Sequence, residues 1–306
     1  MTISYESAFA AGAIITGKWH GRNYRILRIL GEGANGKVFL ASAGAGKNLC
    51  AVKIGYDPLD LQSEINVLKS LSRSDRRNDF FLDADDFAYK GQTYPFYVMK
   101  FIQGIRFDEF LQTYGQDWLY ITAYRLLSKL NRLHRQGWIF GDLKNENVLV
   151  AGYGHIELID YGGVTQTGRS IKQFTEFYDR GFWNAGLRTA EEGYDLFSFA
   201  LLILQLADDR KQLERLRAQL PQNRSAEDLL EVARSSPACA PVFPFLAKAL
   251  QGRYVSSDEA LEEWRELTLK AGAKCALRPR MPWLKGFFIA SLILFISTLV
   301  FLLQQG

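Results

Sequence analysis

The sequence predicts an α+β chain of two lobes, followed by one membrane-spanning helix. Up to residue 101, short apolar segments alternate with glycine, which is typical of a small β-rich lobe. After Gly115 the apolar residues recur at helical spacing, which indicates a larger α-helical lobe. The run from 287 to 303, FFIASLILFISTLVFLL, is apolar throughout. With 306 residues and 48% apolar content, the chain can bury the core of a two-lobed unit of roughly 250 residues.

In the β-rich lobe, one helix is expected to pack on the sheet. Asp57 and Pro58 form a helix start, and Leu61, Ile65 and Leu68 follow at helical spacing. The expected strands are 24–30, 38–41, 50–54 and 94–101.

The larger lobe is expected to surround one buried helix. The segment 119–133 is amphipathic, so one of its faces should meet the core. The segment 196–206 is apolar almost all round, as expected for a helix at the centre of the lobe. This second segment is too short to cross a membrane.

The C-terminal apolar run is expected to span a membrane rather than to form a buried core helix. At ~1.5 Å per residue, a helix from 287 to 303 extends ~25 Å, close to a thin hydrocarbon core. The segment 9–15 is short and broken by glycine, so no signal peptide is expected. Basic residues before the run place the larger N-terminal part in the cytoplasm and should lie against anionic lipids. They are Lys270, Lys274, Arg278, Arg280 and Lys285.

The net charge of +4 arises in that basic stretch, so the rest of the chain is nearly neutral and a broad nucleic-acid-binding face is not expected. Two local clusters are candidate contacts for nucleic acid, although solvated surface is the simpler interpretation. They are Arg73 with Arg76 and Arg77, and Arg210 with Lys211. The cysteines are scattered and are interpreted as reduced, with no metal site; they are Cys50, Cys239 and Cys275.

A glycine-rich turn, GEGANGKVFLA, lies between two expected strands. Gly31, Gly33 and Gly36 let the backbone approach phosphate oxygens closely, and Val38 can cover an adenine ring. A plain hairpin turn and a Rossmann unit are the alternatives. A Rossmann turn should lead into a helix, whereas KVFLA indicates a returning strand.

A lysine on an apolar strand and a glutamate on the apolar face of a helix form the next candidate pair. Lys53 in AVKI would be costly to bury unless it met an anion, such as nucleotide phosphate. Glu64 lies between Leu61 and Leu68 in helical spacing, so it points toward the sheet. We therefore expect Glu64 to pair with Lys53, although each residue alone could lie at an edge or a rim.

The segments IFGDLKNENVLV and LIDYGG carry the side chains that phosphate transfer needs. Asp142 is placed to accept a proton from a hydroxyl group, and Lys144 to balance charge on the moving phosphoryl group. Asn147 and Asp160 can supply oxygens to Mg²⁺. A surface turn rich in Asp and Asn is the alternative, but the flanking strands VLV and IELI argue against it.

With these motifs in this order, residues 20–268 resemble the eukaryotic-like, or Hanks-type, Ser/Thr protein kinases of bacteria. The chain resembles the YabT-type kinases in particular, which also end in a membrane segment. The segments that carry this resemblance are GKWHGRNYRILRILGEGANG, QGWIFGDLKNENVLV, TEFYDRGFWN and YDLFSFA. It implies a bilobal protein-kinase-like fold anchored in the cell membrane. The implied divisions are an N-terminal extension at 1–19, an N-lobe at about 20–101, a C-lobe at about 102–268, a basic juxtamembrane linker at 269–285 and a transmembrane helix at 286–304.

The resemblance also implies an enzyme that uses ATP with Mg²⁺ or Mn²⁺ and phosphorylates Ser or Thr of protein substrates. Asp195 should tie the catalytic loop to the central helix, and Thr175 should contact Asp142 and Lys144. Gly162 belongs to the same loop, Met99 is the implied gatekeeper, and Phe101 with Ile102 form the implied hinge. The implied ATP-binding set is Gly31, Glu32, Gly33, Gly36, Val38, Ala51, Lys53, Met99, Phe101, Ile102 and Leu149.

The segment after Asp160 is expected to be mobile and to be autophosphorylated, which suggests self-association. The candidate sites are Thr165, Thr167 and Ser170. His134 in LHRQG is interpreted as a structural hydrogen-bonding residue rather than an acid-base group.

The sequence departs from the family pattern in three places. Phe140 and Gly141 replace the usual His-Arg pair before the catalytic Asp, so a phosphorylated loop residue lacks its usual partner. Tyr161 is a conservative replacement of Phe. Phe182 stands where the family has a glutamate, which leaves Arg253 without its customary partner. Glu191 or Glu192 is expected to substitute.

Two other functions fit parts of the pattern. A small-molecule kinase of the aminoglycoside or sugar-kinase type shares GDLxxxN, but Lys144 and the glycine-rich turn argue against it. A pseudokinase that serves as a membrane scaffold would explain Phe140, Gly141 and Phe182. The complete set of expected catalytic side chains favours an active enzyme instead.

Overall fold

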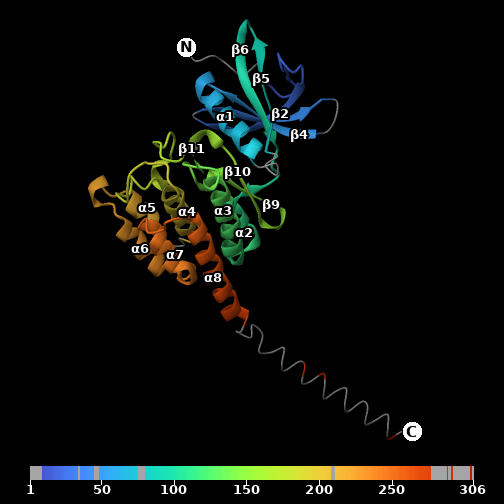
Figure 1. Cartoon of the computed structure of the whole chain (residues 1–306). Coiled ribbons are helices and arrows are strands. Elements are labelled where there is room, and N and C mark those ends of the chain that lie inside the picture. The colour runs from blue at the N-terminus through green and yellow to red at the C-terminus, as the bar shows by residue number, and fades with distance from the viewer. Residues whose placement is uncertain are drawn as a thin grey trace.

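The computed structural model describes residues 9–33, 35–44, 48–74, 80–207 and 211–276, together with residues 288, 291 and 304. A β-rich lobe lies against a larger helical lobe, and the short strands β9–β11 lie where the two lobes meet (Figure 1). The prediction of a two-lobed α+β fold is confirmed.

The β-rich lobe contains one antiparallel sheet with the strand order β1-β2-β3-β4-β6-β5. The expected helix follows β4 and packs on the sheet, with Leu61, Ile65 and Leu68 buried. The elements of this lobe are β1 (Ile14–Thr16), β2 (Asn23–Gly33), β3 (Gly36–Ala43), β4 (Asn48–Gly55), α1 (Pro58–Ser74), β5 (Phe81–Tyr89) and β6 (Gln92–Lys100).

Strand β5 was not predicted, because its sequence FLDADDFAY is rich in aspartate. The aspartates of β5 accept hydrogen bonds from residues 19, 20 and 24, which lie near the start of the chain. Asp83 Oδ2 accepts a hydrogen bond from Tyr24 OH at 2.8 Å. Asp85 accepts from the backbone N–H groups of Trp19 at 2.9 Å and His20 at 2.8 Å. Buried carboxylates are tolerated when they are hydrogen-bonded in this way.

The segment before residue 20 also belongs to this lobe. Strand β1 pairs with β2, so Ile15 lies opposite Tyr24. Phe9 is buried, and its ring centroid lies 5.3 Å from that of Phe39 and 5.6 Å from that of Phe87. Part of the predicted N-terminal extension therefore supplies one strand and two core residues, Phe9 and Ile15, to this lobe.

The helical lobe is built around α4, as predicted. Every residue from Tyr194 to Leu204 is buried, which explains why this helix has no polar face. The amphipathic segment 119–133 is found as α3. The helices are α2 (Phe107–Tyr114), α3 (Leu119–His134), α4 (Glu192–Ala207), α5 (Gln212–Arg217), α6 (Ala226–Ser235), α7 (Phe243–Leu250) and α8 (Ser257–Ala276).

Short strands between the lobes position the loops of the site. β9 and β10 form an antiparallel pair that β7 extends, and β8 pairs with β11. These strands are β7 (Ile105–Arg106), β8 (Trp138–Ile139), β9 (Val148–Ala151), β10 (His155–Leu158) and β11 (Thr165–Gln166). The single-turn 3₁₀ helices are η2 (Gln116–Trp118), η3 (Asn145–Asn147), η4 (Gly152–Gly154), η5 (Tyr161–Gly163), η6 (Glu176–Tyr178), η7 (Pro221–Asn223) and η8 (Ala240–Val242).

Helix α8 runs away from the β-rich lobe and continues into the predicted basic linker (Figure 1). In the described part of the chain, no helix combines the length and apolar character that a bilayer span requires. The predicted transmembrane helix at 286–304 lies outside the described residues except for 288, 291 and 304. Cys50 and Cys239 are buried free thiols.

Candidate active site

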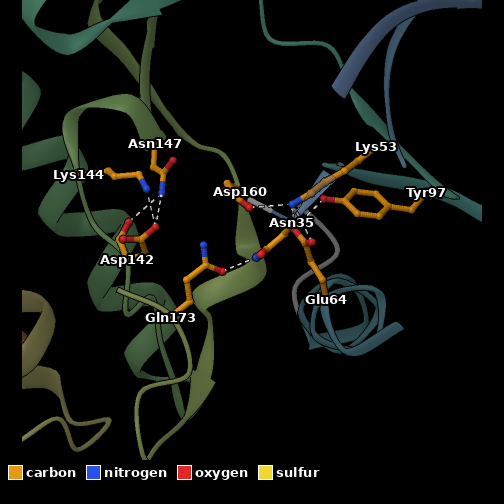
Figure 2. A network of polar contacts seen from close by, with 9 residues as sticks. All are labelled: Asn35, Lys53, Glu64, Tyr97, Asp142, Lys144, Asn147, Asp160 and Gln173. Atoms are coloured by element: carbon orange, nitrogen blue, oxygen red, sulfur yellow. Dashed lines mark hydrogen bonds and ion pairs between the residues drawn. The ribbon is translucent and has the colours of Figure 1, made fainter. Parts of the chain in front are cut away.

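A buried lysine joins the sheet, α1 and the loop after β10. Lys53 on β4 and Glu64 on α1 are each 4% exposed. Lys53 Nζ lies 2.8 Å from Glu64 Oε2 and 2.8 Å from Asp160 Oδ1. Tyr97 OH donates to Glu64 Oε1 at 2.8 Å (Figure 2). The predicted pairing of Lys53 with Glu64 is confirmed.

Burial and charge oppose each other in this cluster. Burial lowers the pKa of the Lys53 ammonium, but the carboxylates of Glu64 and Asp160 outweigh it and hold the pKa above its ordinary value. Burial raises the pKa of Glu64, and Lys53 offsets this only in part. At Asp160 burial also acts to raise the pKa, but Lys53 prevails and keeps it below the ordinary value. Of the two carboxylates, Asp160 therefore keeps its negative charge more readily than Glu64.

The catalytic-loop residues form a second polar group (Figure 2). Lys144 Nζ donates to Asp142 Oδ2 at 2.8 Å and to Thr175 Oγ1 at 3.0 Å. Thr175 Oγ1 in turn donates to Asp142 Oδ1 at 2.8 Å, so the contacts expected of Thr175 are present. Asn147 Nδ2 donates to the backbone oxygen of Asp142 at 2.8 Å. The side-chain carbonyl oxygen of Asn147 is thereby left available to bind a metal ion.

Glycines allow the two loops that carry these residues to lie against each other. Gly141 has φ +80°, and a Cβ added there would lie 2.7 Å from the backbone oxygen of Gly163. A Cβ on Gly163 would lie 3.0 Å from the Cβ of Asp142. The left-handed backbone and the close approach thus account for glycine at 141.

Asp195 fixes the catalytic loop to α4, as the family resemblance implies. It is fully buried and accepts hydrogen bonds from the backbone N–H groups of Phe140 at 2.7 Å and Gly141 at 2.9 Å. His134 Nε2 lies 2.8 Å from Asp195 Oδ2, which agrees with a structural hydrogen-bonding role for this histidine. Among the described residues, His134 Nδ1 has no hydrogen-bond partner.

Three aromatic rings, those of Phe80, Tyr161 and Phe140, form a column that connects the two lobes. The Tyr161 ring centroid lies 5.2 Å from that of Phe80 and 5.9 Å from that of Phe140. Tyr161 directly follows Asp160, and Phe140 is held by Asp195. This aromatic column therefore links the start of β5 to the buried helix α4. Phe80 was not identified from the sequence.

The glycine-rich turn is a hairpin between β2 and β3, which excludes the Rossmann alternative. Gly36 has φ +149°, and an added Cβ would lie 2.2 Å from the backbone oxygen of Ile54, so only glycine fits. At Gly31 and Gly33 an added Cβ would meet no atom within 4 Å. This side of the turn is open, as a phosphate-covering loop requires.

Several of the residues expected to bind ATP belong to the large apolar core shared by both lobes or pack on it. Leu30, which was not identified from the sequence, packs against the same apolar cluster. Phe101 and Leu149 are half-buried, whereas Glu32 is exposed and accepts a hydrogen bond from Tyr56 OH at 2.6 Å. The predicted residues that belong to the cluster or pack on it are Val38, Ala51, Met99 and Ile102.

A carboxamide bridge that sequence reasoning missed connects the glycine-rich turn to the segment before Thr175. Asn35 Nδ2 donates to Gln173 Oε1 at 2.7 Å (Figure 2). Both amides lie beside Gly162, since a Cβ added there would be 3.1 Å from Gln173 Oε1 and 3.5 Å from Asn35 Nδ2. The bridge therefore lies next to Asp160, and neither residue has a spacing pattern that could predict it.

Part of the segment after Asp160 forms a short strand that the sequence did not predict. Thr165 is 1% exposed, lies on β11 and donates its hydroxyl to the backbone oxygen of Gly163 at 2.9 Å. In this conformation its hydroxyl is not accessible to a kinase site, because pairing with β8 turns the residue inward, and modification of Thr165 stays a prediction. Thr167 and Ser170 are exposed.

The expected substitute partner of Arg253 is also wrong. Glu191 pairs with Arg180 at 2.6 Å, and Glu192 accepts a hydrogen bond from the backbone N–H of Ser257. Among the described residues, no carboxylate pairs with Arg253. The loop is held elsewhere, through a residue whose role was not predicted.

That residue is Asp179. It is fully buried, forms an ion pair with Arg188 at 2.6 Å and accepts a hydrogen bond from Tyr194 OH at 2.9 Å. It also accepts from the backbone N–H groups of Gly181 and Phe182. Asp179 lies three residues before Phe182, the position at which the family has a glutamate. The buried carboxylate of Asp179 therefore anchors this loop in place of that glutamate.

The donor set fits a hard cation that is shared with phosphate. No group of three or more His, Cys, Asp and Glu side chains able to hold a metal occurs within the described ranges. Mg²⁺ is usually bound through one or two carboxylates together with substrate phosphates and water. The Asp160 carboxylate and the Asn147 carbonyl oxygen suit this mode of binding.

The candidate nucleic-acid contacts are described only in part. Arg73 and Lys211 are exposed. Arg76, Arg77 and Arg210 lie outside the described residues.

Comparison with known proteins agrees with this geometry. Residues 24–245 match the model of the protein kinase domain family. The chain is 39% identical over 281 residues to the serine/threonine-protein kinase YabT of Bacillus subtilis, which covers 90% of this chain and 79% of that protein. It is 30% identical to the RAC serine/threonine-protein kinase of Drosophila melanogaster, over 50% of this chain and 26% of that protein. It is 32% identical to human protein kinase C eta type, over 46% of this chain and 21% of that protein.

Substitution of Asp179 and of Arg253, the two residues that could anchor the loop, should change the free energy of unfolding by different amounts. Asp179→Asn should lower the free energy of unfolding by about 3 kcal/mol, because it removes a buried charge that receives several hydrogen bonds. Arg253→Gln should change it by less than about 0.5 kcal/mol, as expected of an exposed side chain away from such contacts. Urea denaturation of both variants measures the difference. Equal losses in the two variants would contradict the assignment of Asp179.

Proposed function

The chain belongs to the protein kinase family and is a serine/threonine protein kinase, and from this premise we propose how its site transfers phosphate. We propose that the γ-phosphate of ATP passes to a Ser or Thr hydroxyl beside Asp142. The single observation that carries this proposal is the joint placement of two polar groups, Lys53–Glu64–Asp160 and Asp142–Lys144–Thr175, at the junction of the lobes.

Each polar group has a distinct task in this proposal. Lys53, held by Glu64, binds nucleotide phosphate, and Asp160 with Asn147 holds Mg²⁺ or Mn²⁺ against the phosphates. The bound metal supplies positive charge that offsets the charge of the transferring group. Asp142 accepts the proton of the attacking hydroxyl.

Lys144 and Thr175 support Asp142 in this reaction. The Lys144 ammonium lies between the Asp142 carboxylate and the Thr175 hydroxyl, where it can neutralise the moving phosphoryl group. Thr175 fixes the second oxygen of Asp142, so the carboxylate keeps one orientation. All of these contacts form without a phosphorylated loop residue. We therefore expect basal activity before any modification.

Isosteric change of the proposed base tests the reaction. Asp142→Asn should lower the rate of phosphate transfer to a protein substrate by about two to four orders of magnitude, because proton transfer is lost. Lys53→Met should also abolish transfer, whereas Arg253→Gln should leave it unchanged. Radiolabelled phosphate transfer by the full chain measures all three rates, with thermal melting as the control for folding.

The outcomes separate the other two functions. Transfer to metabolites but never to protein would identify a small-molecule kinase. Failure of the native chain to bind Mg·ATP would identify a scaffold without catalysis.

We further propose that the chain phosphorylates itself on Thr167 or Ser170, which are exposed on the segment after Asp160. Incubation with Mg·ATP followed by peptide mass spectrometry should find phosphate there in the native chain. It should find none in Asp142→Asn or in the double variant Thr167→Ala with Ser170→Ala. Modification of Thr165 instead would require β11 to open, and no modification at all would refute self-phosphorylation.

Residues 286–304 are proposed to anchor this kinase in the cell membrane, with the catalytic lobes in the cytoplasm and the linker 269–285 against anionic lipids. The apolar run and the basic residues before it support this proposal. After alkaline carbonate extraction of expressing bacteria, the full chain should stay in the membrane pellet. A chain that ends at residue 276 should move to the supernatant. Extraction of both chains would refute the anchor.

A further inference from the structure

A buried histidine with one unused ring nitrogen lies behind the catalytic loop. His134 is the last residue of α3, and its side chain has no exposed surface. Nε2 lies 2.8 Å from Asp195 Oδ2, whereas Nδ1 has no hydrogen-bond partner among the described residues. A buried polar atom without a partner is unfavourable and rare in native proteins. It therefore points to a second arrangement of the chain in which this nitrogen is satisfied.

A second carboxylate faces the unused nitrogen. Glu192 and Asp195 lie three residues apart on α4, which places them on one face of that helix. Glu192 Oε2 lies 3.9 Å from His134 Nδ1, which is about 1 Å longer than a hydrogen bond. The Glu192 side chain is 34% exposed, so it has room to rotate and close this gap. The imidazole thus lies between two carboxylates and presents one nitrogen to each.

Helix α8 holds Glu192 away from the histidine. Glu192 Oε2 accepts a hydrogen bond from the backbone N–H of Ser257, the first residue of α8. Ser256 caps this helix, since its Oγ accepts from the N–H of Glu259 at 3.3 Å. The N–H of Ser257 is one of those that a helix start leaves without a partner inside the helix. Contact with α8 therefore keeps the Glu192 oxygen out of hydrogen-bond range of His134.

The first turn of α8 docks on α3 through polar contacts. Asp258 Oδ1 accepts a hydrogen bond from Asn131 Nδ2 at 2.8 Å and forms an ion pair with Arg135. Further along the helix, Trp264 is fully buried and holds the middle of α8 in the core. Beyond this tryptophan, α8 continues into the predicted linker 269–285 (Figure 1). A tilt of α8 about the tryptophan would therefore move its first turn away from α3 and α4.

We propose that His134 is a positioning residue for phosphate transfer and that Glu192 is a switch controlled by α8. A neutral imidazole carries one N–H, so it can donate to one carboxylate only. While Ser257 holds Glu192, the proton lies on Nε2 and is donated to Asp195. When α8 releases Glu192, one proton leaves Nε2 as another binds Nδ1, and Nδ1 then donates to Glu192. The ring stays neutral, but the lone pair of Nε2 now faces Asp195.

The consequence for catalysis rests on the proposed function, in which Asp142 is the base. Asp195 Oδ2, the oxygen that contacts His134, also accepts the backbone N–H of Phe140. Repulsion from the lone pair of Nε2 would displace this carboxylate, and the backbone of the catalytic loop would follow it. Asp142 lies two residues further on and must meet the substrate hydroxyl within a narrow range of distance. The released state should therefore slow phosphate transfer without removing the ATP site.

Nitrogen NMR of the full chain in detergent tests the state of the ring. The position of the proton is read from the chemical shifts of the two ring nitrogens. Since the sequence has three histidines, His134→Leu identifies the signals of this one. The native chain should show a neutral ring with its proton on Nε2. A doubly protonated ring, or a proton on Nδ1, at the pH of the kinase assay would overturn the proposal. This measurement needs no change in α8.

A proline at the start of α8 releases Glu192. Ser257→Pro removes the N–H that Glu192 accepts, and proline is well tolerated at the first position of a helix. Ser257→Ala keeps the N–H and is the matched control. Ser257→Pro should move the ring proton to Nδ1 and lower kcat about tenfold or more, with the KM for ATP changed less than about twofold. Ser257→Ala should keep both constants within about twofold of the native values. An unchanged kcat in a Ser257→Pro chain whose ring proton has moved would refute the positioning role of His134.

A second substitution separates the switch from damage to the helix. Glu192→Gln keeps the shape of the side chain, and its amide can donate to the lone pair of His134 Nδ1, so the ring proton stays beside Asp195. Adding Glu192→Gln to Ser257→Pro should therefore restore kcat to within about threefold of the native value, as expected of two residues that act on each other. Absence of this rescue would show that the proline acts by distorting α8 and would sink the switch. Full activity of Asp142→Asn would refute the proposed function instead, while the NMR result would still decide where the ring proton lies.

Discussion

The ammonium of Lys53 between the carboxylates of Glu64 and Asp160 is the interaction on which the site depends. A charge buried to this degree is costly unless it is paired, so the strand, the helix and the loop that carry the three residues must approach together. The cost of a missing partner is large because the remaining charge would stay buried. Helix α1 and the segment from Asp160 are thereby tied to one point of the sheet. The same constraint holds Asp160 in its ionised form, as the proposed binding of Mg²⁺ requires.

Apolar packing acts beside this polar constraint. The rings of Phe80, Tyr161 and Phe140, in tilted and edge-to-face contact, run from the β-rich lobe to the loop that Asp195 holds. Replacement of the usual histidine by Phe140 keeps an aromatic ring in that column. Replacement of arginine by glycine at 141 fits the left-handed backbone at that position. Both departures from the family pattern are thus compatible with an aligned site.

The sequence predicted those parts of the fold and site whose residues are close together or follow a regular spacing. The turn from Gly31 to Gly36, the central helix α4 and the loop around Asp142 all belong to this group. Strand β5 was missed because its aspartates are unfavourable in a strand until Tyr24 and two backbone N–H groups satisfy them. Those partners lie far away in sequence, so no local pattern contains the information.

The same reasoning explains why contacts of the segment between Asp160 and Arg188 were missed. Asp179 and Arg188 form their pair within a loop, and no periodic pattern marks the two residues as partners. The Asn35–Gln173 bridge joins residues that are distant in the chain. Asn and Gln are common on protein surfaces, so neither residue indicated a contact. This bridge depends on how the lobes close, because Asn35 belongs to the β-rich lobe and Gln173 to the helical lobe. Sequence reasoning predicted the two lobes but had no measure of how they close.

Taken together, these contacts indicate where control of the enzyme can act. The loop that carries Thr175 is fixed on one side by Asp142 and Lys144 and on the other by Asp179, and neither side uses a phosphate group. A phosphorylated residue therefore has no arginine at 141 to bind and no unfilled role in aligning this loop. Control must then act on an element that can still move relative to the others. Phe80 and Tyr161 of the aromatic column and Leu71 near the end of α1 meet that requirement, because one side of each borders a cavity.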